Sequence, residues 1–300
     1  MGNISSWVSA ARLRTLPLSI SGIIVGTVLA AHHGSFNLAV FSLALGTTLG
    51  LQILSNFAND YGDGVKGTDN ENRVGPARAL QSGLISPKEM KQGIVATAAI
   101  TLFMAILLIY TAFGREDFYF AIFFFVLGVA AITAAIKYTV GNNAYGYRGL
   151  GDVFVFIFFG LVAVYGSYFL YAQEFNWKIL LPACSIGFLS AGVLNLNNMR
   201  DRLSDEKAGK NTLVVKLGDQ RAKNYHYSLI IGALLCFLVF SVLTANGFTD
   251  FIYVFAFIPL LFHLKRVVQN ENPALLDPEL KILALTTFFI SVLFGLGILI

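Results

Sequence analysis

Two stretches of the chain place asparagine and aspartate at intervals of four residues. The first, LSNFANDYGDGVKGTDN (residues 54–70), puts Asn59 four residues before Asp63, with Asp60 and Asp69 close by. On a helix, side chains four residues apart lie one turn apart on the same face. Carboxylates gathered in this way repel one another unless a cation lies among them, and Mg²⁺ takes one or two carboxylates together with substrate phosphates. The stretch therefore predicts a divalent-cation site.

The second stretch, NLNNMRDRLSDEKAGKNT (residues 195–212), repeats the pattern. Asn197, Asp201 and Asp205 follow one another at intervals of four, again where an apolar run ends. Stability alone does not favour acidic ladders at the ends of membrane helices, and acidic residues at such positions are functional candidates. We expect the two ladders to form one site.

The composition predicts an all-α polytopic membrane protein. The chain has 300 residues, of which 56% are hydrophobic and 13% charged, and its mean hydropathy is +0.69. A soluble domain of this size could not bury so much apolar surface. The net charge of +4 is small and gives no reason to expect a nucleic-acid partner. The lipid bilayer is the expected environment.

Nine apolar runs are long enough to cross a bilayer, which needs about 20 residues each. The predicted spans cover residues 15–32, 37–58, 91–112, 118–139, 152–171, 178–199, 226–245, 249–265 and 281–299. The basic residues orient them: with the N-terminus in the cytoplasm, only Arg115 and Lys178 of the 21 basic residues fall in outer connections. Both acidic ladders then face the cytoplasm.

The ladders follow the second and sixth predicted spans. Four spans separate them, which indicates two four-helix units with a ninth helix added. We expect one transmembrane domain over residues 1–300.

Two basic residues of the first long loop, Lys66 and Arg78, are candidates for binding a diphosphate. A guanidinium group forks onto phosphate oxygens, and an ammonium group offers a compact charge. Both residues also fit the ordinary excess of basic residues in cytoplasmic loops. Both interpretations stay open from the residues alone. For Lys207 and Lys210, after the second ladder, we predict a solvated cytoplasmic surface, and we assign the four histidines no role.

The middle loop, KYTVGNNAYGYRGLGD (residues 137–152), combines tyrosine, glycine and basic residues. Lys137 and Arg148 could contact an anionic substrate, and Tyr138 with the two following tyrosines could stack on a ring or hydrogen-bond to it. An interfacial aromatic belt with basic anchors is the alternative. Asp152 is either a helix cap or a ligand.

Together these features suit a ligand with a diphosphate head and a long hydrocarbon tail. Mg²⁺ between carboxylates and diphosphate would improve the leaving group. If the tail is allylic, departure leaves a carbocation, which a dry, aromatic-lined pocket would protect from water. A transporter is the alternative from another class, although transporter sites lie near the bilayer midplane rather than at one end of the spans.

These motifs resemble those of the UbiA superfamily of intramembrane prenyltransferases. The similarity covers almost the whole chain and includes RLRTLPLS, SNFANDYGDGVKGTD, GPARALQSG, KYTVGNNAYGYRGLGD, NLNNMRD and GKNTLVVKLG. These motifs are most similar to those of the members that prenylate 1,4-dihydroxy-2-naphthoate. The resemblance implies a polyprenyl diphosphate donor, Mg²⁺ as cofactor and a bacterial cytoplasmic (inner) membrane. It implies attack by the ring carbon that bears the carboxylate, with loss of carbon dioxide to give demethylmenaquinone; 4-hydroxybenzoate or homogentisate is the alternative acceptor.

The resemblance also assigns roles to individual residues. It places metal and diphosphate binding at Asn59, Asp60, Asp63, Asp69, Asn197, Asp201 and Asp205, with Asp60, Asp63, Asp201 and Asp205 as catalytic candidates. It places diphosphate or substrate contacts at Lys66, Arg78, Lys137 and Tyr138, and the acceptor carboxylate at Arg12 and Arg148. Many relatives have a third aspartate four residues after the position of Asp63; Gly67 stands there in this chain, and Asp69 is the expected substitute.

Overall fold

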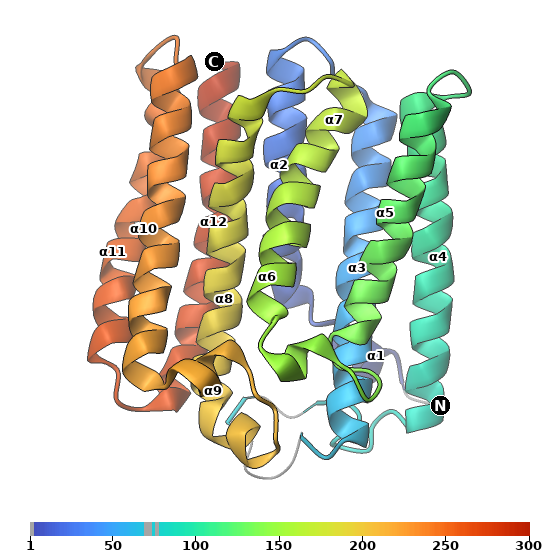
Figure 1. Cartoon of the computed structure of the whole chain (residues 1–300), viewed down its shortest axis with the longest axis vertical. Helices are drawn as coiled ribbons and strands as arrows, with labels where there is room; N and C mark the ends of the chain where they lie inside the picture. The colour runs from blue at the N-terminus through green and yellow to red at the C-terminus, as the bar shows by residue number, and fades with distance from the viewer. Residues whose placement is uncertain (1–2, 69–73, 76–77) are drawn as a thin grey trace.

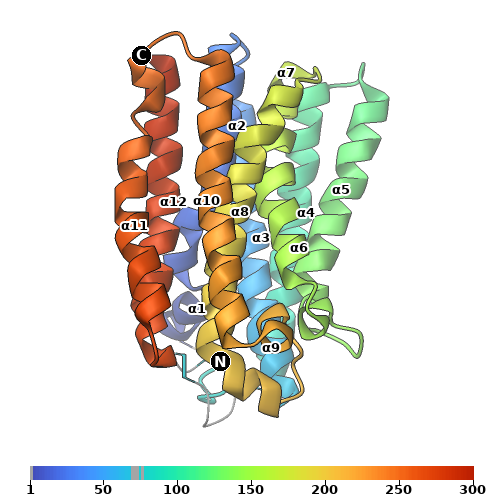
Figure 2. The same cartoon turned by 60° about the vertical axis from the view of Figure 1, so that its left-hand side comes forward.

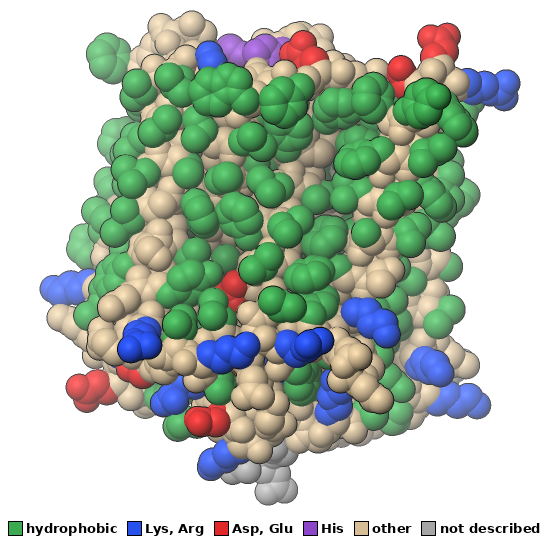
Figure 3. Space-filling model, viewed as in Figure 1, with side chains coloured by type: hydrophobic (Ala, Val, Ile, Leu, Met, Phe, Trp, Pro, Cys, Tyr) green, Lys and Arg blue, Asp and Glu red, His purple; other side chains and the backbone are tan. Residues whose placement is uncertain are grey.

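The computed structural model describes residues 3–68, 74–75 and 78–300. Within these residues the chain is helical and contains no strand, and nine helical segments are long and apolar enough to cross a membrane. The helices run side by side along one direction (Figure 1). Hydrophobic side chains form a broad belt around them, and Lys and Arg side chains gather below that belt (Figure 3). The predicted class, an all-α protein with nine membrane spans, is confirmed.

The elements follow one another along the chain without a long irregular segment in the second half. They are α1 (Ile4–Ala11), η1 (Leu13–Thr15), α2 (Leu16–His32), α3 (Leu38–Val65), α4 (Pro87–Phe113), α5 (Phe118–Lys137), η2 (Tyr145–Arg148), α6 (Gly151–Val155), η3 (Phe156–Gly166), α7 (Ser167–Ala172), η4 (Trp177–Ile179), α8 (Leu180–Lys207), α9 (Leu213–Leu217), α10 (Asp219–Thr244), η5 (Phe248–Phe251), α11 (Val254–Gln269), η6 (Pro273–Leu275) and α12 (Leu276–Leu299).

The two helices that carry the ladders are longer than the sequence predicted. Their apolar runs were expected to end at residues 58 and 199, but α3 continues to Val65 and α8 to Lys207. Hydropathy marks where hydrocarbon contact ends, whereas the backbone hydrogen bonds of a helix continue into the polar region. The acidic residues of both ladders therefore project from ordered helical turns rather than from loops.

The first predicted span is preceded by a separate short helix. α1 ends where Arg12 adopts a left-handed backbone conformation (φ 50°), and the single turn η1 then leads into α2. Asn56 of α3 donates a hydrogen bond to the Ala11 carbonyl at 2.8 Å, which ties the end of α1 to α3. This turn and α9 lie at the same end of the bundle (Figures 1 and 2). We call this end the motif end.

The fifth span is one continuous run, but its middle part, η3, is a π-helix between α6 and α7. Gly160 lies in this part, and a Cβ atom there would be 2.6 Å from the Ala183 carbonyl oxygen and from Gly187 Cα of α8. The absence of a side chain thus lets η3 approach the backbone of α8. π-Helical turns frequently occur at functional sites, and here η3 forms one wall of the internal cavity.

α8 is the most buried of the described spans: 67% of its most apolar stretch is buried, whereas only 11% of the most apolar stretch of α5 is buried. α10, α11 and α12 lie on one side of α8, and α3, α4 and α5 on the other (Figures 1 and 2). A series of buried polar contacts links α10, α11 and α12 at the motif end. His226 of α10 contacts His263 of α11 through their Nε2 atoms at 2.9 Å, and His263 Nδ1 contacts Glu279 of α12 at 2.5 Å.

Candidate active site

Acidic residues from the two ladders meet in one cleft at the motif end. Lys210 lies between them: its Nζ is 3.4 Å from Asp63 Oδ2 and 3.8 Å from Asp205 Oδ1, and its side chain is 8% exposed. One ammonium group therefore reaches carboxylates from helices whose ladders are far apart in the sequence. The cleft is polar throughout and is lined by Asp63, Thr68, Arg78, Asp201, Ser204, Asp205 and Lys210.

Asp63 has the densest set of contacts in this cleft. Arg78 donates to its Oδ2 at 2.8 Å and also to the Asn59 carbonyl, while the Tyr147 hydroxyl donates to its Oδ1 at 2.7 Å. Lys66 lies alongside, with its Nζ 3.9 Å from the centre of the Tyr147 ring. Burial lowers the pKa of the Lys66 amine, and the Asp63 carboxylate partly offsets this shift. Arg78 thus lies where an anionic ligand of this cleft would be. Lys66 is exposed, donates to the Thr139 carbonyl at 2.7 Å, and lies beside the cleft without lining it.

The second ladder is held by Arg200, which is 2% exposed. Its guanidinium group donates to both oxygens of Asp201, at 2.9 and 2.7 Å, and to Asn197 Oδ1 at 2.8 Å. It also reaches Asp277 of α12. The Asn197 and Asp201 oxygens therefore face one cation, as the oxygens of a metal-ligand set do.

Asp60 differs from the other acidic residues of the ladders. It is buried, and its carboxylate accepts hydrogen bonds from the backbone amides of Ala79 and Leu80, at 3.2 and 3.4 Å. Asp60 therefore anchors the segment that presents Arg78, although it also lines the end of the internal cavity. Asp69, the expected substitute for a third aspartate, lies outside the described residues.

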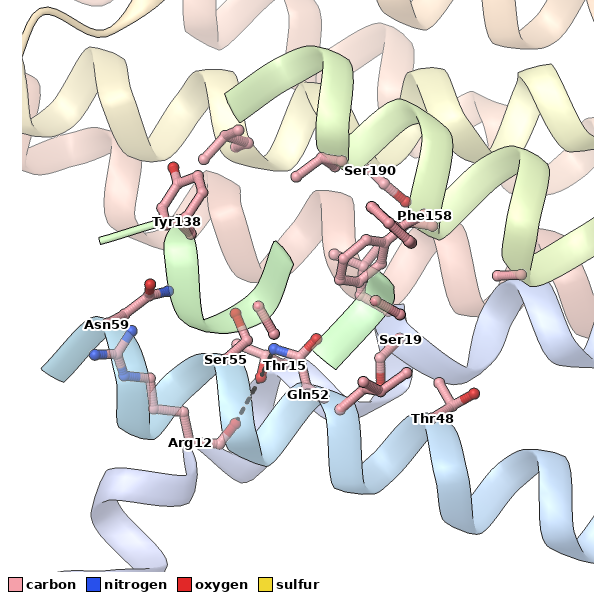
Figure 4. A pocket seen from close by; sticks show the side chains of 18 of the residues that line it. Arg12, Thr15, Ser19, Thr48, Gln52, Ser55, Asn59, Tyr138, Phe158 and Ser190 are labelled. Atoms are coloured by element: carbon pink, nitrogen blue, oxygen red, sulfur yellow. Dashed lines mark hydrogen bonds between the residues drawn. The ribbon is translucent and has the colours of Figure 1, made fainter. Parts of the chain in front are cut away.

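A cavity of about 1040 Å³ opens beside the cleft and continues along the bundle. Near the motif end it is lined by Asn59, Asp63, Arg78, Asn197 and Arg200. Aromatic side chains, among them Tyr138 and Phe158, form one wall, and polar groups of η1 and α3 lie across from them (Figure 4). The far part is apolar and reaches Phe124 and Leu170 at the opposite end of the helices. A charged head and a long hydrocarbon tail fit this division.

The predicted basic and aromatic contacts separate into two groups. Arg12 and Tyr138 line the cavity, and burial with nearby carboxylates raises the pKa of the Tyr138 hydroxyl well above its usual range, so it stays a neutral donor. Lys137 and Arg148 are exposed and are not among the lining residues of the cavity or the cleft. Helix α5 and the turn η2 direct their side chains outward, and the Arg148 carbonyl accepts a hydrogen bond from Lys216.

The structure brings to the ladders three residues that the sequence did not place there; of these, Tyr147 was predicted to contact a substrate ring. Lys210 was expected on a solvated surface, but it is buried between Asp63 and Asp205. Arg200 and Tyr147 also contact ladder carboxylates directly. The only signal in the sequence was adjacency to the second ladder for Arg200 and Lys210, and basic residues next to a membrane span are too common to single out two of them.

Fold and site together define a class of membrane-embedded helical protein in which two acidic motifs meet above a long apolar cavity. Residues 19–293 match the UbiA prenyltransferase family, and this chain belongs to that family.

Two bacterial relatives match over nearly their whole length. A 1,4-dihydroxy-2-naphthoate octaprenyltransferase of Haemophilus influenzae is 44% identical over 299 residues, covering 99% of this chain and 96% of the relative. The protein of the same name from Escherichia coli is 42% identical over 295 residues, covering 98% and 94%. The solved structure of a UbiA homolog from Archaeoglobus fulgidus bound to DMAPP and Mg²⁺ superposes with a TM-score of 0.61 at 19% identity, covering 94% and 98%.

Proposed function

We propose that this protein transfers a polyprenyl group from polyprenyl diphosphate to 1,4-dihydroxy-2-naphthoate, with decarboxylation, to give demethylmenaquinone. The observation that carries this proposal is the convergence of both acidic ladders at the polar end of a cavity that is otherwise apolar. The names of the two bacterial relatives, each above 40% identity over nearly the full length, support the choice of acceptor.

The residues of the cleft fit a divalent cation in the type of donor they offer. Asp63, Asp201 and Asp205 supply carboxylate oxygens, Asn59 and Asn197 supply amide oxygens, and we keep Asp69 in the same set. Among the described residues no three His, Cys, Asp or Glu side chains lie together as a metal site, and Arg78, Lys210 and Arg200 contact the oxygens of Asp63 and Asp201. Bound Mg²⁺ would complete its shell with diphosphate oxygens and neutralise the leaving group. The A. fulgidus homolog with DMAPP and Mg²⁺ supports this assignment.

The cationic side chains of the cleft would then bind the diphosphate. Arg78 and Lys210 already face the carboxylates at salt-bridge distance. Lys66, whose ammonium lies over the Tyr147 ring and donates to the Thr139 carbonyl, does not line the cleft and would reach the diphosphate only from its edge. When a metal occupies the carboxylates, Arg78 and Lys210 would turn from Asp63 to the diphosphate and stabilise the charge on the departing group. We assign Lys137 and Arg148 no contact in this site, because neither lines it.

The cavity would control the bond-breaking and bond-forming steps. The allylic C–O bond breaks and its electron pair leaves with diphosphate; the walls of the cavity, including Tyr138, Phe154 and Phe158, exclude water from the cation. The hydroquinone ring forms the new C–C bond at the carbon bearing the carboxylate, and carbon dioxide departs, leaving its bonding electrons to restore the aromatic ring. Arg12, which lines the polar part of the cavity, would pair with the acceptor carboxylate.

We further infer one transmembrane domain over residues 1–300 in a bacterial cytoplasmic membrane, with the motif end in the cytoplasm. A transporter is not favoured, because the charged cleft is lined by residues near the last turns of α3 and α8 rather than midway along them.

The function is tested with purified protein, Mg²⁺, octaprenyl diphosphate and carboxyl-labelled 1,4-dihydroxy-2-naphthoate. We expect labelled carbon dioxide and prenylated product in equal amounts, and a loss of turnover of at least about 100-fold in both Asp63→Asn and Asp201→Asn. Glu116→Gln, an exposed change at the opposite end of the bundle, is the matched control and should keep full activity. Retained turnover in both aspartate variants would exclude the metal site, and preferred prenylation of 4-hydroxybenzoate or homogentisate would identify another acceptor.

A further inference from the structure

The cavity has one polar wall whose groups the proposed chemistry has not used. Gln52 lies on α3 seven residues before Asn59, and therefore about two turns further from the acidic cleft on the same helix face. Thr15 of η1 faces it across the turn after α1 (Figure 4). An amide or hydroxyl group beside apolar surface costs free energy if it has no hydrogen-bond partner. A group of this wall that lacks a partner within the protein therefore indicates a contact with a bound ligand.

A chain of hydrogen bonds fixes the Gln52 amide. The Thr15 hydroxyl donates its one hydrogen to the Arg12 carbonyl at 2.9 Å. It can therefore only accept from its other neighbours, which are Gln52 Nε2 at 3.1 Å and Asn56 Nδ2 at 3.2 Å. Asn56, which is 3% exposed, is fixed in turn by the Ala11 carbonyl at 2.8 Å and offers its Oδ1 to Gln52 Nε2 at 3.4 Å.

This chain decides which way the Gln52 amide points. Both neighbours of its nitrogen are hydrogen-bond acceptors, so the amide cannot be turned over without setting acceptor against acceptor. The Gln52 oxygen is consequently directed away from Thr15, and no described residue donates a hydrogen bond to it. Because Gln52 lines the cavity, this oxygen is an acceptor offered to a ligand (Figure 4).

The ligand that satisfies such an oxygen must carry a hydrogen-bond donor. A polyprenyl diphosphate has none in its hydrocarbon tail, and its head belongs in the cationic cleft. An aromatic hydroquinone acid has two hydroxyl groups. The 1-hydroxyl lies beside the carboxylate and donates to it internally, which leaves the 4-hydroxyl as the donor that needs a partner.

We propose that Gln52 accepts a hydrogen bond from the 4-hydroxyl of the aromatic acceptor and thereby selects for a 1,4-dihydroxy ring. This inference rests on the proposed function. The same tether that orients Gln52 also holds the turn carrying Arg12, so the hydroxyl and carboxylate contacts of one acceptor are set by a single hydrogen-bonded unit of Ala11, Arg12, Thr15, Gln52 and Asn56. A site built around a substrate hydroxyl discriminates against analogues that lack the donor, because its acceptor is then left unpaired.

The test compares two acceptors of similar electron density. 4-Methoxy-1-hydroxy-2-naphthoate keeps an electron-donating oxygen at the 4-position but cannot donate a hydrogen bond. With octaprenyl diphosphate and Mg²⁺, we expect the wild-type protein to use it with kcat/KM at least about tenfold below that of the dihydroxy acid. In Gln52→Met, kcat/KM should fall about tenfold for the dihydroxy acid and change little for the methoxy acid, so that the preference largely disappears. Gln92→Met, an exposed change on α4, should keep the wild-type preference.

The outcomes separate the two proposals. A wild-type protein that does not prenylate the dihydroxy acid contradicts the proposed function. If it does, but uses both acids equally well, or if Gln52→Met lowers both kcat/KM values by the same factor, the Gln52 assignment is wrong. The KM for octaprenyl diphosphate should be unchanged in Gln52→Met, which distinguishes loss of the hydroxyl contact from a damaged cavity. The wild-type comparison needs no variant, and equal use of the two acids would overturn the assignment even if Gln52→Met does not fold.

Discussion

At the scale of single residues, the acidic cleft is stabilised by cations that the protein itself supplies. Lys210 and Arg78 both contact Asp63, and Arg200 holds Asp201. Each pair is almost fully enclosed, and removing one partner of a buried pair leaves an uncompensated charge. The same cations suit a diphosphate once a metal occupies the carboxylates. This arrangement lets the cleft remain folded before the substrates bind.

Replacement of Lys210 should expose this compensation. In Lys210→Met, without Mg²⁺, the carboxylates of Asp63 and Asp205 lose the ammonium group between them, and we expect a loss of about 3 kcal/mol in stability. Added Mg²⁺ should raise the unfolding temperature of this variant more than that of the wild type, because the metal replaces the missing charge. Thermal unfolding in detergent, with and without Mg²⁺, measures both effects.

Lys216→Met serves as the control for this prediction, since Lys216 lies in the same segment but is exposed and contacts only a carbonyl in the described part of the chain. It should unfold like the wild type under both conditions. An equal rise in unfolding temperature on adding Mg²⁺ to Lys210→Met and to the wild type would mean that the Lys210 ammonium does not occupy the place of the metal ion.

The sequence predicted the ladder residues of this site better than it predicted their partners. The four-residue spacing of Asn59 with Asp63, and of Asp201 with Asp205, is a local pattern that a helix converts directly into a shared face. Lys210 reaches Asp63 across 147 positions, and His226 reaches His263 across 37. Such contacts depend on how helices pack, and no spacing rule within one segment contains that information.

At the scale of elements, the site depends on close approaches between helices. Gly160 allows η3 to lie against α8, and η3 contributes cavity residues such as Phe158 and Phe159. The nine predicted spans correspond to nine helical segments among the described residues, but the π-helical η3 and the extra turns of α3 and α8 were not foreseen. Apolar windows identify which residues contact lipid or core, and they carry no information on the hydrogen-bond register of the helix.

A methyl group at Gly160 should separate η3 from α8. In Gly160→Ala the new Cβ would lie 2.6 Å from backbone atoms of Ala183 and Gly187, so the two elements must shift, at a cost of about 1–3 kcal/mol. We expect a lower unfolding temperature in detergent together with a raised KM for octaprenyl diphosphate. Gly166→Ala is the matched control in the same element, because its nearest neighbouring atom is 3.8 Å away and the change should be tolerated. Equal unfolding temperatures for the two variants would contradict the inference that Gly160 allows η3 to approach α8.

At the scale of the whole molecule, the distribution of charge gives the bundle two different ends. Basic side chains gather at the motif end (Figure 3). The start of α1 lies at this end (Figure 1), and the acidic cleft is lined by residues of the last turns of α3 and α8 there. Basic residues favour the cytoplasmic side of a membrane. Both proposed substrates carry anionic groups, so a cleft on that side would meet them where soluble intermediates are made, while the apolar part of the cavity extends toward the opposite leaflet.

This orientation can be tested by labelling single cysteines in intact cells. In a variant whose native Cys184 and Cys236 are replaced by alanine, Asn142→Cys places a thiol at the motif end and Asn246→Cys places one at the opposite end; both positions are exposed. A membrane-impermeant maleimide should label the cysteine at position 246 in intact cells and the one at position 142 only after the inner membrane is permeabilised. The two sites serve as controls for each other, since denatured protein should label equally at both. The reverse pattern would place the acidic cleft on the outer side of the membrane and contradict the cytoplasmic site, because the maleimide reaches only thiols on the outer side of an intact membrane.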